Sequence, residues 1–224
     1  MSSHRQHPPA SAPTAAQQQE LQARAVTTRQ ALLRAAGEQF DAAGYRGTSL
    51  REIVERSGVT KGALYFHFPG KPALANAVIA ETIATWERMV AEIEARGLDP
   101  LRCLIAETSR VAELMLHDPV VRGGTRLLND PLVPTTWAGE HYRYAQHAVR
   151  TQLVTAAAAG LLRAEVDISE LARWVVTLVV GHNLICERTN ALDELPGHVT
   201  EMWRAMLPLI ATEAWLQGWQ RSER

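Results

Sequence analysis

The stretch 58–68, GVTKGALYFHF, places hydrogen-bonding side chains, glycines and aromatic rings within eleven positions. At helical spacing its polar positions share one face, which consists of Thr60, Lys61, Gly62, Tyr65 and His67. Lys61 can donate to guanine acceptors or to phosphate, and His67 can bind phosphate. Tyr65 offers a ring to a thymine methyl group and a hydroxyl to phosphate. The chemistry available to this face is contact with double-stranded DNA.

Gly62 is unusual inside a short helix, because glycine there costs about 1 kcal/mol relative to alanine. The missing side chain, however, would let the helix backbone approach a DNA edge. Val59 and Leu64 are expected to hold the short helix on its neighbours. Phe66 and Phe68 are expected to flank its end and anchor it against the next helix. The alternative interpretation is a plain helical hairpin whose polar face is only solvated.

Two helices upstream would position this face. Segment 27–45, TTRQALLRAAGEQFDAAGY, repeats apolar residues with a period of 3.6, and Gly44 stands where that helix should stop. Thr48 and Ser49 can cap a second helix, and Thr60 can cap the short third one. Three helices with a tight, glycine-containing turn between the second and third form a helix-turn-helix.

Composition and charge agree with a folded protein of one or two modules, since 46% of the 224 residues are apolar and 21% are charged. The net charge of -1 excludes a uniformly basic surface. Charge is nevertheless segregated: residues 1–72 hold nine Lys and Arg against five Asp and Glu, whereas the remainder holds fourteen against nineteen. No apolar pattern of period two is present, so an all-α fold is predicted.

The first 22 residues are rich in Ser, Pro, Ala and Gln and lack the apolar core of a signal peptide. We therefore expect a disordered tail over 1–22, a helix-turn-helix DNA-binding domain over 23–72, and a ligand-binding and dimerisation domain over 73–220, with about nine helices in all. The longest apolar block, 174–186, is shorter than the about 20 residues that a bilayer span needs. No membrane association is expected, and the protein is placed in the cytoplasm, on the nucleoid when bound to DNA.

Metal, redox and catalytic chemistry have little support in the sequence. Cys103 and Cys186 lie far apart without CxxC spacing, so reduced core cysteines are expected. His141 and His147 are six residues apart and point in different directions on a helix, so they cannot chelate a metal together. G-x-S-x-G, H-E-x-x-H, P-loop and dinucleotide-binding patterns are absent. No metal, no cofactor and no enzymatic activity are expected.

The order of residues 27–79, TTRQALLRAAGEQFDAAGYRGTSLREIVERSGVTKGALYFHFPGKPALANAVI, resembles the DNA-binding head of the TetR (tetracycline repressor) family. The resemblance implies an all-helical repressor that works as a homodimer and whose variable C-terminal body binds a small molecule. Pro69 and Pro72 are local departures that leave the start of the fourth helix open. Position by position, the resemblance implies DNA contacts at Thr48, Ser49, Arg51, Lys61, Gly62, Tyr65, His67 and Lys71.

The body begins with a long predicted helix, 71–96, which would act as a lever between ligand and DNA. Segment 118–131, DPVVRGGTRLLNDP, is predicted to be a short helix broken by Gly123 and Gly124. Its pattern D-P-V-V-R-x-x-x-R-L is similar to a stretch in the gamma-butyrolactone receptor branch of the family. Members of this branch sense lactones, furans or butenolides and control antibiotic biosynthesis, so the resemblance implies an effector of this type.

One face of segment 135–160 combines aromatic rings with hydrogen-bonding tips, as a small-molecule cavity requires. Trp137 stands where the butyrolactone receptors carry a pocket tryptophan, and Tyr144 lies on the same face. We expect both to contact the ligand, together with Arg126, Trp86 and Thr177. The alternative is that Trp137 and Tyr144 only fill the core with their polar tips satisfied.

Two late segments indicate self-association. Residues 174–186 are apolar nearly all round, and segment 198–219 carries an apolar stripe with Pro208 predicted to kink it. Pairing both helices with their symmetry mates would form a homodimer interface. Two alternatives to a lactone-responsive repressor stay open: a DNA-binding relative that responds to no ligand, and a multidrug-sensing efflux repressor.

Overall fold

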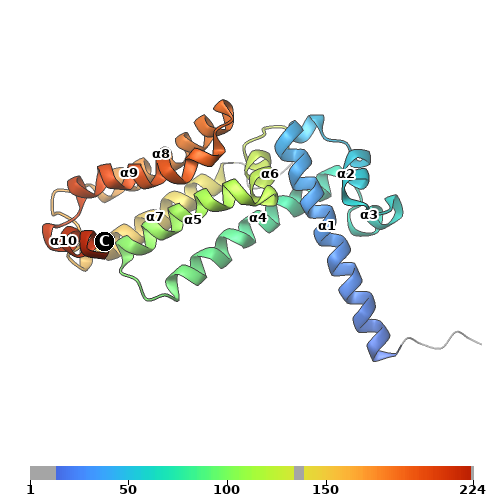
Figure 1. Ribbon diagram of the computed structural model, residues 1–224, viewed down its shortest axis with the longest axis horizontal. Helices are drawn as coiled ribbons and strands as arrows, with labels where there is room; N and C mark the ends of the chain where they lie inside the picture. The colour runs from blue at the N-terminus through green and yellow to red at the C-terminus, as the bar shows by residue number, and fades with distance from the viewer. Residues whose placement is uncertain (1–13, 134–138, 223–224) are drawn as a thin grey trace, which may run out of the picture.

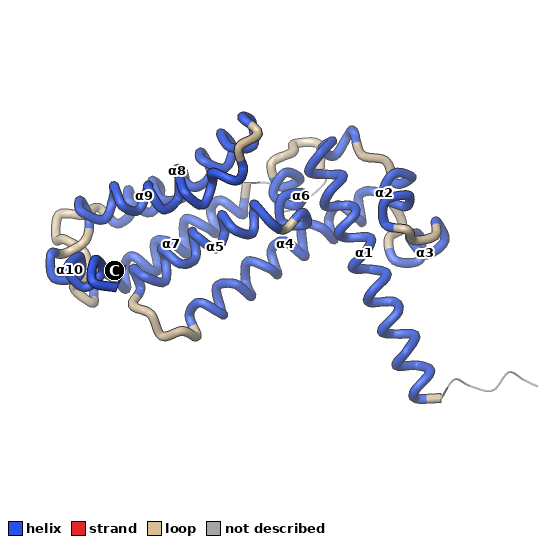
Figure 2. Tube along the Cα trace, viewed as in Figure 1, coloured by secondary structure: helices blue, strands red, loops and turns tan. Residues whose placement is uncertain are grey.

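The computed structural model describes residues 14–133 and 139–222. Within these ranges the chain folds into ten α-helices and one 3₁₀ turn (Leu192–Glu194), without a strand (Figures 1 and 2), which confirms the predicted all-α fold. The helices are α1 (Ala15–Gly47), α2 (Leu50–Ser57), α3 (Lys61–His67), α4 (Lys71–Glu94), α5 (Pro100–His117), α6 (Pro119–Leu128), α7 (Glu140–Ala158), α8 (Ile168–Thr189), α9 (Leu195–Ile210) and α10 (Glu213–Ser222).

Helix α1 begins at Ala15, so the prediction of a disordered tail is wrong for residues 15–22. Thr14 caps the helix: its hydroxyl accepts from the N–H of Gln17, and the Gln17 side chain accepts from the N–H of Thr14. The alanine and glutamine residues that suggested disorder are also good helix formers once such a cap is present. The first turns of α1 are exposed and project away from the rest of the molecule (Figure 1).

Gly44 interrupts the regular conformation of α1, as its position in the sequence predicted. Its φ of 69° lies in the left-handed region, and helical hydrogen bonding continues to Gly47 beyond the kink. Thr48 then closes the helix, because its buried hydroxyl donates to the carbonyl oxygens of Gln39 (3.0 Å) and Gly44 (2.8 Å).

Buried apolar side chains form one core in the head, another in the body, and a small third cluster of Met89, Ile93 and Cys103 from α4 and α5. The body core is built from α5, α7, α8 and α9 around Trp203, whose indole N–H donates to the Thr108 hydroxyl at 2.8 Å. Trp86 on α4 packs against both cores. The head core takes residues from α1, α2, α3, α4 and α6, among them Phe40, Ile53, Leu64, Leu74 and Leu127.

Helix α6 runs without interruption through Gly123 and Gly124, so the prediction that these glycines break it is wrong. They instead allow close helix crossings with α1 and α4 (Figure 1). A Cβ on Gly123 would lie 2.3 Å from the carbonyl oxygen of Gly37 on α1. A Cβ on Gly124 would lie 2.0 Å from the hydroxyl oxygen of Thr82 on α4. Glycine is therefore required at both positions because α1 and α4 approach too closely to admit a Cβ, and not because of turn geometry.

The C-terminal segment differs from the single kinked helix that the sequence predicted. Helix α9 ends at Ile210, two residues after Pro208, and α10 begins at Glu213. The end of α9 and the backbone that follows it bond to the loop before α8: the N–H of Arg163 donates to the carbonyl of Ile210, and the N–H of Thr212 donates to the carbonyl of Leu161, both at 2.9 Å. Pro208 thus stands near the end of a helix.

The cysteines, the possible metal ligands and the lengths of the apolar helices can now be described. Cys103 and Cys186 are both free and buried. Residues 14–133 and 139–222 contain no group of three or more His, Cys, Asp or Glu arranged to hold a metal ion. No helix in these ranges has the length and apolar character needed to traverse a bilayer.

Candidate DNA-binding surface

Local capping bonds set the geometry of α2 and α3. The Ser49 hydroxyl accepts from the N–H of Glu52, whose carboxylate accepts in return from the N–H and hydroxyl of Ser49. This bond to Ser49 is the main reason that the pKa of Glu52 is lowered. Gly58 ends α2 in the left-handed conformation with φ 67°, and the Thr60 hydroxyl accepts from the N–H of Ala63 to start α3. The turn is therefore determined by residues within it.

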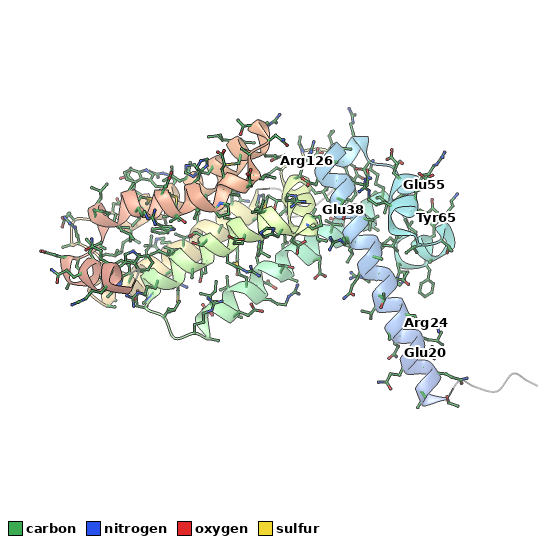
Figure 3. All side chains as sticks on the ribbon, viewed as in Figure 1. Glu20, Arg24, Glu38, Glu55, Tyr65 and Arg126 are labelled. Carbon is green, nitrogen blue, oxygen red and sulfur yellow. The ribbon has the colours of Figure 1, made fainter. Side chains whose placement is uncertain are left out.

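Helix α3 is held by its apolar side and presents its polar side outward. Leu64 is fully buried and Phe68 is 4% exposed, so both belong to the head core as predicted. Tyr65 is 47% exposed and points away from the body (Figure 3). The Lys61 ammonium lies 6.0 Å from the centre of the Tyr65 ring, so a cation and an aromatic face stand side by side at the surface.

Phe66 does not anchor α3 against the next helix, and that prediction is wrong. Its side chain is 81% exposed and its ring contacts only the edge of His67 among the aromatic contacts of the described residues, at a centroid distance of 5.2 Å. Phe66 follows Gly62 by four positions, so helical spacing already placed it on the outward face. This exposed phenylalanine adds an apolar group to the candidate DNA surface.

Gly62 has no packing reason to be glycine. A Cβ built on it would have no neighbour within 4 Å outside its own helix, in contrast to Gly123 and Gly124. Its backbone lies on an exposed helix where glycine reduces helix stability. The space in front of Gly62 is therefore available to a molecule that approaches the helix closely.

Two residues with implied DNA contacts have structural roles in the head. Thr48 is 2% exposed and its hydroxyl bonds within α1, so its side chain is not available for the implied DNA contact. The Lys71 ammonium donates to the carbonyl oxygens of Thr48 (2.6 Å) and Arg46 (3.3 Å) and lies 4.7 Å from the centre of the Tyr45 ring. Partial burial lowers its pKa. Lys71 thus joins the start of α4 to the end of α1.

The start of α2 presents the other exposed groups. Ser49 and Arg51 are both exposed, and Arg51 pairs with Glu55 one turn later at 2.8 Å. Such an exposed pair within one helix is weak and its arginine can turn to another anion. Thr60 is exposed and His67 is half-buried at the two ends of α3. The surface therefore consists of Ser49, Arg51, Thr60, Lys61, Gly62, Tyr65, Phe66 and His67.

The residues expected to bind a ligand are not brought together in the described structure. Trp137 lies outside the described residues. Tyr144 on α7 is 66% exposed, and Thr177 on α8 is also exposed, so neither side chain lines the interior of the protomer. Trp86 is half-buried, and its indole N–H is buried without a hydrogen-bond partner among the described residues.

Arg126, expected at the ligand, instead connects α6 to α1 (Figure 3). Its guanidinium donates to the carbonyl oxygen of Asp41 and lies beside Gly44. One turn earlier, Arg122 pairs with the Asp41 carboxylate at 2.7 Å, and Asp118 caps the helix by accepting from the N–H groups of Val120 and Val121. The conspicuous pattern 118–127 therefore encodes the attachment of the body to the head.

Comparisons with known proteins agree with this arrangement. Residues 32–78 match the family described as "Bacterial regulatory proteins, tetR family", and residues 98–211 match "Tetracyclin repressor-like, C-terminal domain". The A-factor receptor protein of Streptomyces griseus is 35% identical over 193 residues, which are 85% of this chain and 66% of that protein's length.

Two solved structures have the same fold. A gamma-butyrolactone receptor described as ArpA-like is 31% identical with a TM-score of 0.75, over 86% of this chain and 92% of the other. CprB from Streptomyces coelicolor in complex with its operator sequence is 30% identical with a TM-score of 0.73, over 85% and 92%. With a helix-turn-helix head, a helical body and both family matches in order along the sequence, the chain belongs to the tetR family of bacterial regulatory proteins, which bind DNA and are not enzymes.

Proposed function

We propose that this protein is a ligand-responsive transcriptional repressor that binds a palindromic operator as a homodimer. The observation that carries the proposal is the outward face of α3, where Lys61 and Tyr65 flank a glycine with open space before it. The operator complex of CprB, which shares this fold, supports the same use of the head. Operator binding would locate the protein on the nucleoid in the cytoplasm.

Each exposed group of the head has a proposed task. Lys61, Tyr65 and Phe66 enter the major groove, where an ammonium can donate to guanine and rings can contact thymine methyl groups. Ser49 and Arg51 bind backbone phosphates at the start of α2. Thr60, Gly62 and His67 complete the surface. Lys71 keeps α1 and α4 in place rather than reading bases.

The homodimer is proposed to form through α8 and α9. On α8, Trp174, Leu184 and Ile185 are each more than half exposed in the single protomer, and Leu209 on α9 is 72% exposed. Exposed apolar side chains of this size on adjacent helices are typical of a buried interface. A two-fold dimer would place its two recognition helices about 34–36 Å apart, one turn of DNA.

The proposed effector is a small signalling molecule of the gamma-butyrolactone, furan or butenolide type, and the proposed targets are genes of antibiotic or secondary-metabolite biosynthesis. The similarity to the A-factor receptor protein and to an ArpA-like gamma-butyrolactone receptor supports this class. We place the ligand at Trp86, because its indole N–H, unpartnered among the described residues, can donate to a ligand carbonyl. Trp137, outside the described residues, stays a proposed ligand contact from the sequence alone. Tyr144 and Thr177 lie too exposed to line an interior cavity, and Arg126 is engaged with α1.

Ligand binding is proposed to act on the head through α4 and α6. Trp86 stands on α4 between the two cores, and α6 is bonded to α1 through Arg122 and Arg126. A ligand that moves α4 must therefore shift α6 and the head together. Linkage requires DNA to weaken ligand binding by the same factor by which ligand weakens DNA binding, typically about 5- to 150-fold.

An electrophoretic shift of the protein on the DNA upstream of its own gene tests the proposal. Synthetic lactones, furans and butenolides are added, with cationic dyes as a second panel. Release by one member of the first panel is the expected result. Release by the dyes alone would indicate a multidrug sensor, and a band that neither panel releases would favour a relative that responds to no ligand.

A further inference from the structure

A groove of about 270 Å³ lies between α7 and α8. Both helices belong to the body and lie away from α3 (Figure 1). Arg143, His147 and Arg150 line it from α7, where their spacing of four and three residues puts them on one helix face. Ser169 and Arg173 line it from the first turns of α8. Three guanidinium groups and an imidazole from two helices thus surround one small space.

The positive charge of the groove is not neutralised by carboxylates among its lining residues. No Asp or Glu is among its lining residues. Arg143 pairs with Glu140 and Arg173 pairs with Glu170, but each partner is three residues earlier on the same exposed helix face. Exposed pairs of this kind are weak, so either arginine can exchange its partner for a ligand anion.

Arg150 is the arginine of the groove that is most available to bind an anion. Among the described residues it has no carboxylate partner, and its Nε lies 3.5 Å from the Ser169 hydroxyl, at the limit of a hydrogen bond. That contact directs the guanidinium across the groove from α7 towards α8. The body is otherwise acidic, with fourteen Lys and Arg against nineteen Asp and Glu after residue 72, so general basicity does not explain the cluster.

Guanidinium groups bind phosphate with two parallel hydrogen bonds, and several of them can neutralise a multiply charged anion. The volume falls just below that of sites for drug-sized molecules, which begin at about 300 Å³. We propose that the groove between α7 and α8 binds a small phosphate-bearing anion, a pyrophosphate or a phosphate monoester, through Arg143, Arg150 and Arg173. Neither Trp86 nor any other residue expected at the signalling-molecule site lines this groove, so the inference stands apart from the proposed function.

Calorimetric titration with sodium pyrophosphate, at an ionic strength held constant with sodium chloride, tests the proposal on the full-length protein. Saturable binding to the native protein is expected. Arg150→Gln should weaken it by about tenfold or more, because a hydrogen bond to a charged group is lost. Arg150→Lys keeps the positive charge but lacks the planar guanidinium, so its affinity for pyrophosphate should lie between those of the native protein and Arg150→Gln. Arg110→Gln, which removes an exposed arginine of α5 outside the groove, is the matched control and should bind as the native protein does.

Three results would overturn the proposal. The first is heat that does not saturate with pyrophosphate. The second is an equal affinity in the native protein and in Arg150→Gln, provided that both melt at the same temperature without ligand. The third is an Arg150→Gln variant that loses affinity for a non-operator DNA duplex as strongly as for pyrophosphate, since this would assign the groove to the DNA backbone.

Discussion

At the scale of single residues, burial separates polar side chains that look equivalent in the sequence. Thr48 and Lys71 use their donors on carbonyl oxygens of α1 and hold the head together. Lys61 and Tyr65 have no such task and stay exposed. The same chemical groups therefore either stabilise the fold or stay exposed for the proposed DNA contacts, according to which backbone acceptors lie within reach.

Gly62 gives the sharpest test of the recognition surface. Gly62→Ala should raise the free energy of unfolding by up to about 1 kcal/mol, because a Cβ there meets nothing and alanine favours a helix. The same change should weaken operator binding, since the added methyl group keeps the backbone from the base edges. Thermal unfolding and an operator titration measure the two effects.

Gly218→Ala on α10 is the matched control for Gly62→Ala, since its Cβ also has open space. It should add helix stability and leave operator affinity unchanged. A Gly62→Ala protein that binds the operator as tightly as the native protein would refute the assignment of α3 to the major groove.

Glu107 predicts a specific pH dependence of stability. Burial on α5, with the Glu94 carboxylate as a second cause, raises its pKa to about 7, against a bond from the Gln152 amide at 3.2 Å. Because the unfolded chain ionises this carboxyl at lower pH than the folded chain, its contribution to stability is complete below a pH of about 4.5 and is lost as pH rises through about 7.

In Glu107→Gln the free energy of unfolding should therefore decrease less between pH about 4.5 and about 7 than it does in the native protein. At pH 8 the variant should be more stable than the native protein by about 1–2 kcal/mol, a value reduced for the solvent that still reaches the group. Urea unfolding at several pH values measures this, with the exposed Glu92→Gln of α4 as control. Parallel pH profiles for native protein and Glu107→Gln would contradict the assignment.

At the scale of elements, α6 is the helix whose role changes most between sequence and structure. Its glycines bring it against α1 and α4, and its two arginines bind Asp41 at the end of the head. The long α4 was predicted to be the lever, yet the head is also joined to the body through α6. Two helices therefore couple the domains.

Gly124→Ala tests the tightness of this crossing. The added Cβ would overlap the buried Thr82 side chain at 2.0 Å, and overpacking of this kind typically costs about 1–3 kcal/mol. A lower melting temperature is expected. The double variant Gly124→Ala with Thr82→Ala removes the overlapping group and should recover part of the loss. A single variant that melts with the native protein would mean that α6 is free to move away from α4.

At the scale of the whole molecule, the proposed function uses two separate exposed surfaces. The head exposes the polar and aromatic face of α3, which is the proposed DNA surface, and α8 with α9 exposes apolar side chains, which form the proposed dimer surface. Palindromic DNA recognition needs both, because one head alone reads only one half-site. Dimerisation and operator affinity should therefore be lost together.

Charges placed on the apolar face should separate the protomers. Ile185→Glu with Leu209→Glu should weaken the dimer by about tenfold or more per substitution, since both side chains are more than half exposed in the protomer but buried in the proposed interface. Light scattering and operator titration should show a folded monomer with poor operator binding. Leu132→Glu, 49% exposed between α6 and α7, is the control. A double variant that stays dimeric at the same concentration would place the interface elsewhere.

The sequence by itself determined the elements that depend on local interactions. Periodicity, capping residues and turn glycines sufficed for the all-α class and for the helix-turn-helix with its caps at Ser49 and Thr60, because their bonds join residues a few positions apart. Only the tertiary structure decided what depends on distant contacts. It buried Thr48, placed Gly123 and Gly124 where α6 crosses α1 and α4, and brought Arg126 to the carbonyl oxygen of Asp41. Contacts between residues that are far apart in the sequence depend on how the helices pack, and local sequence patterns do not predict them.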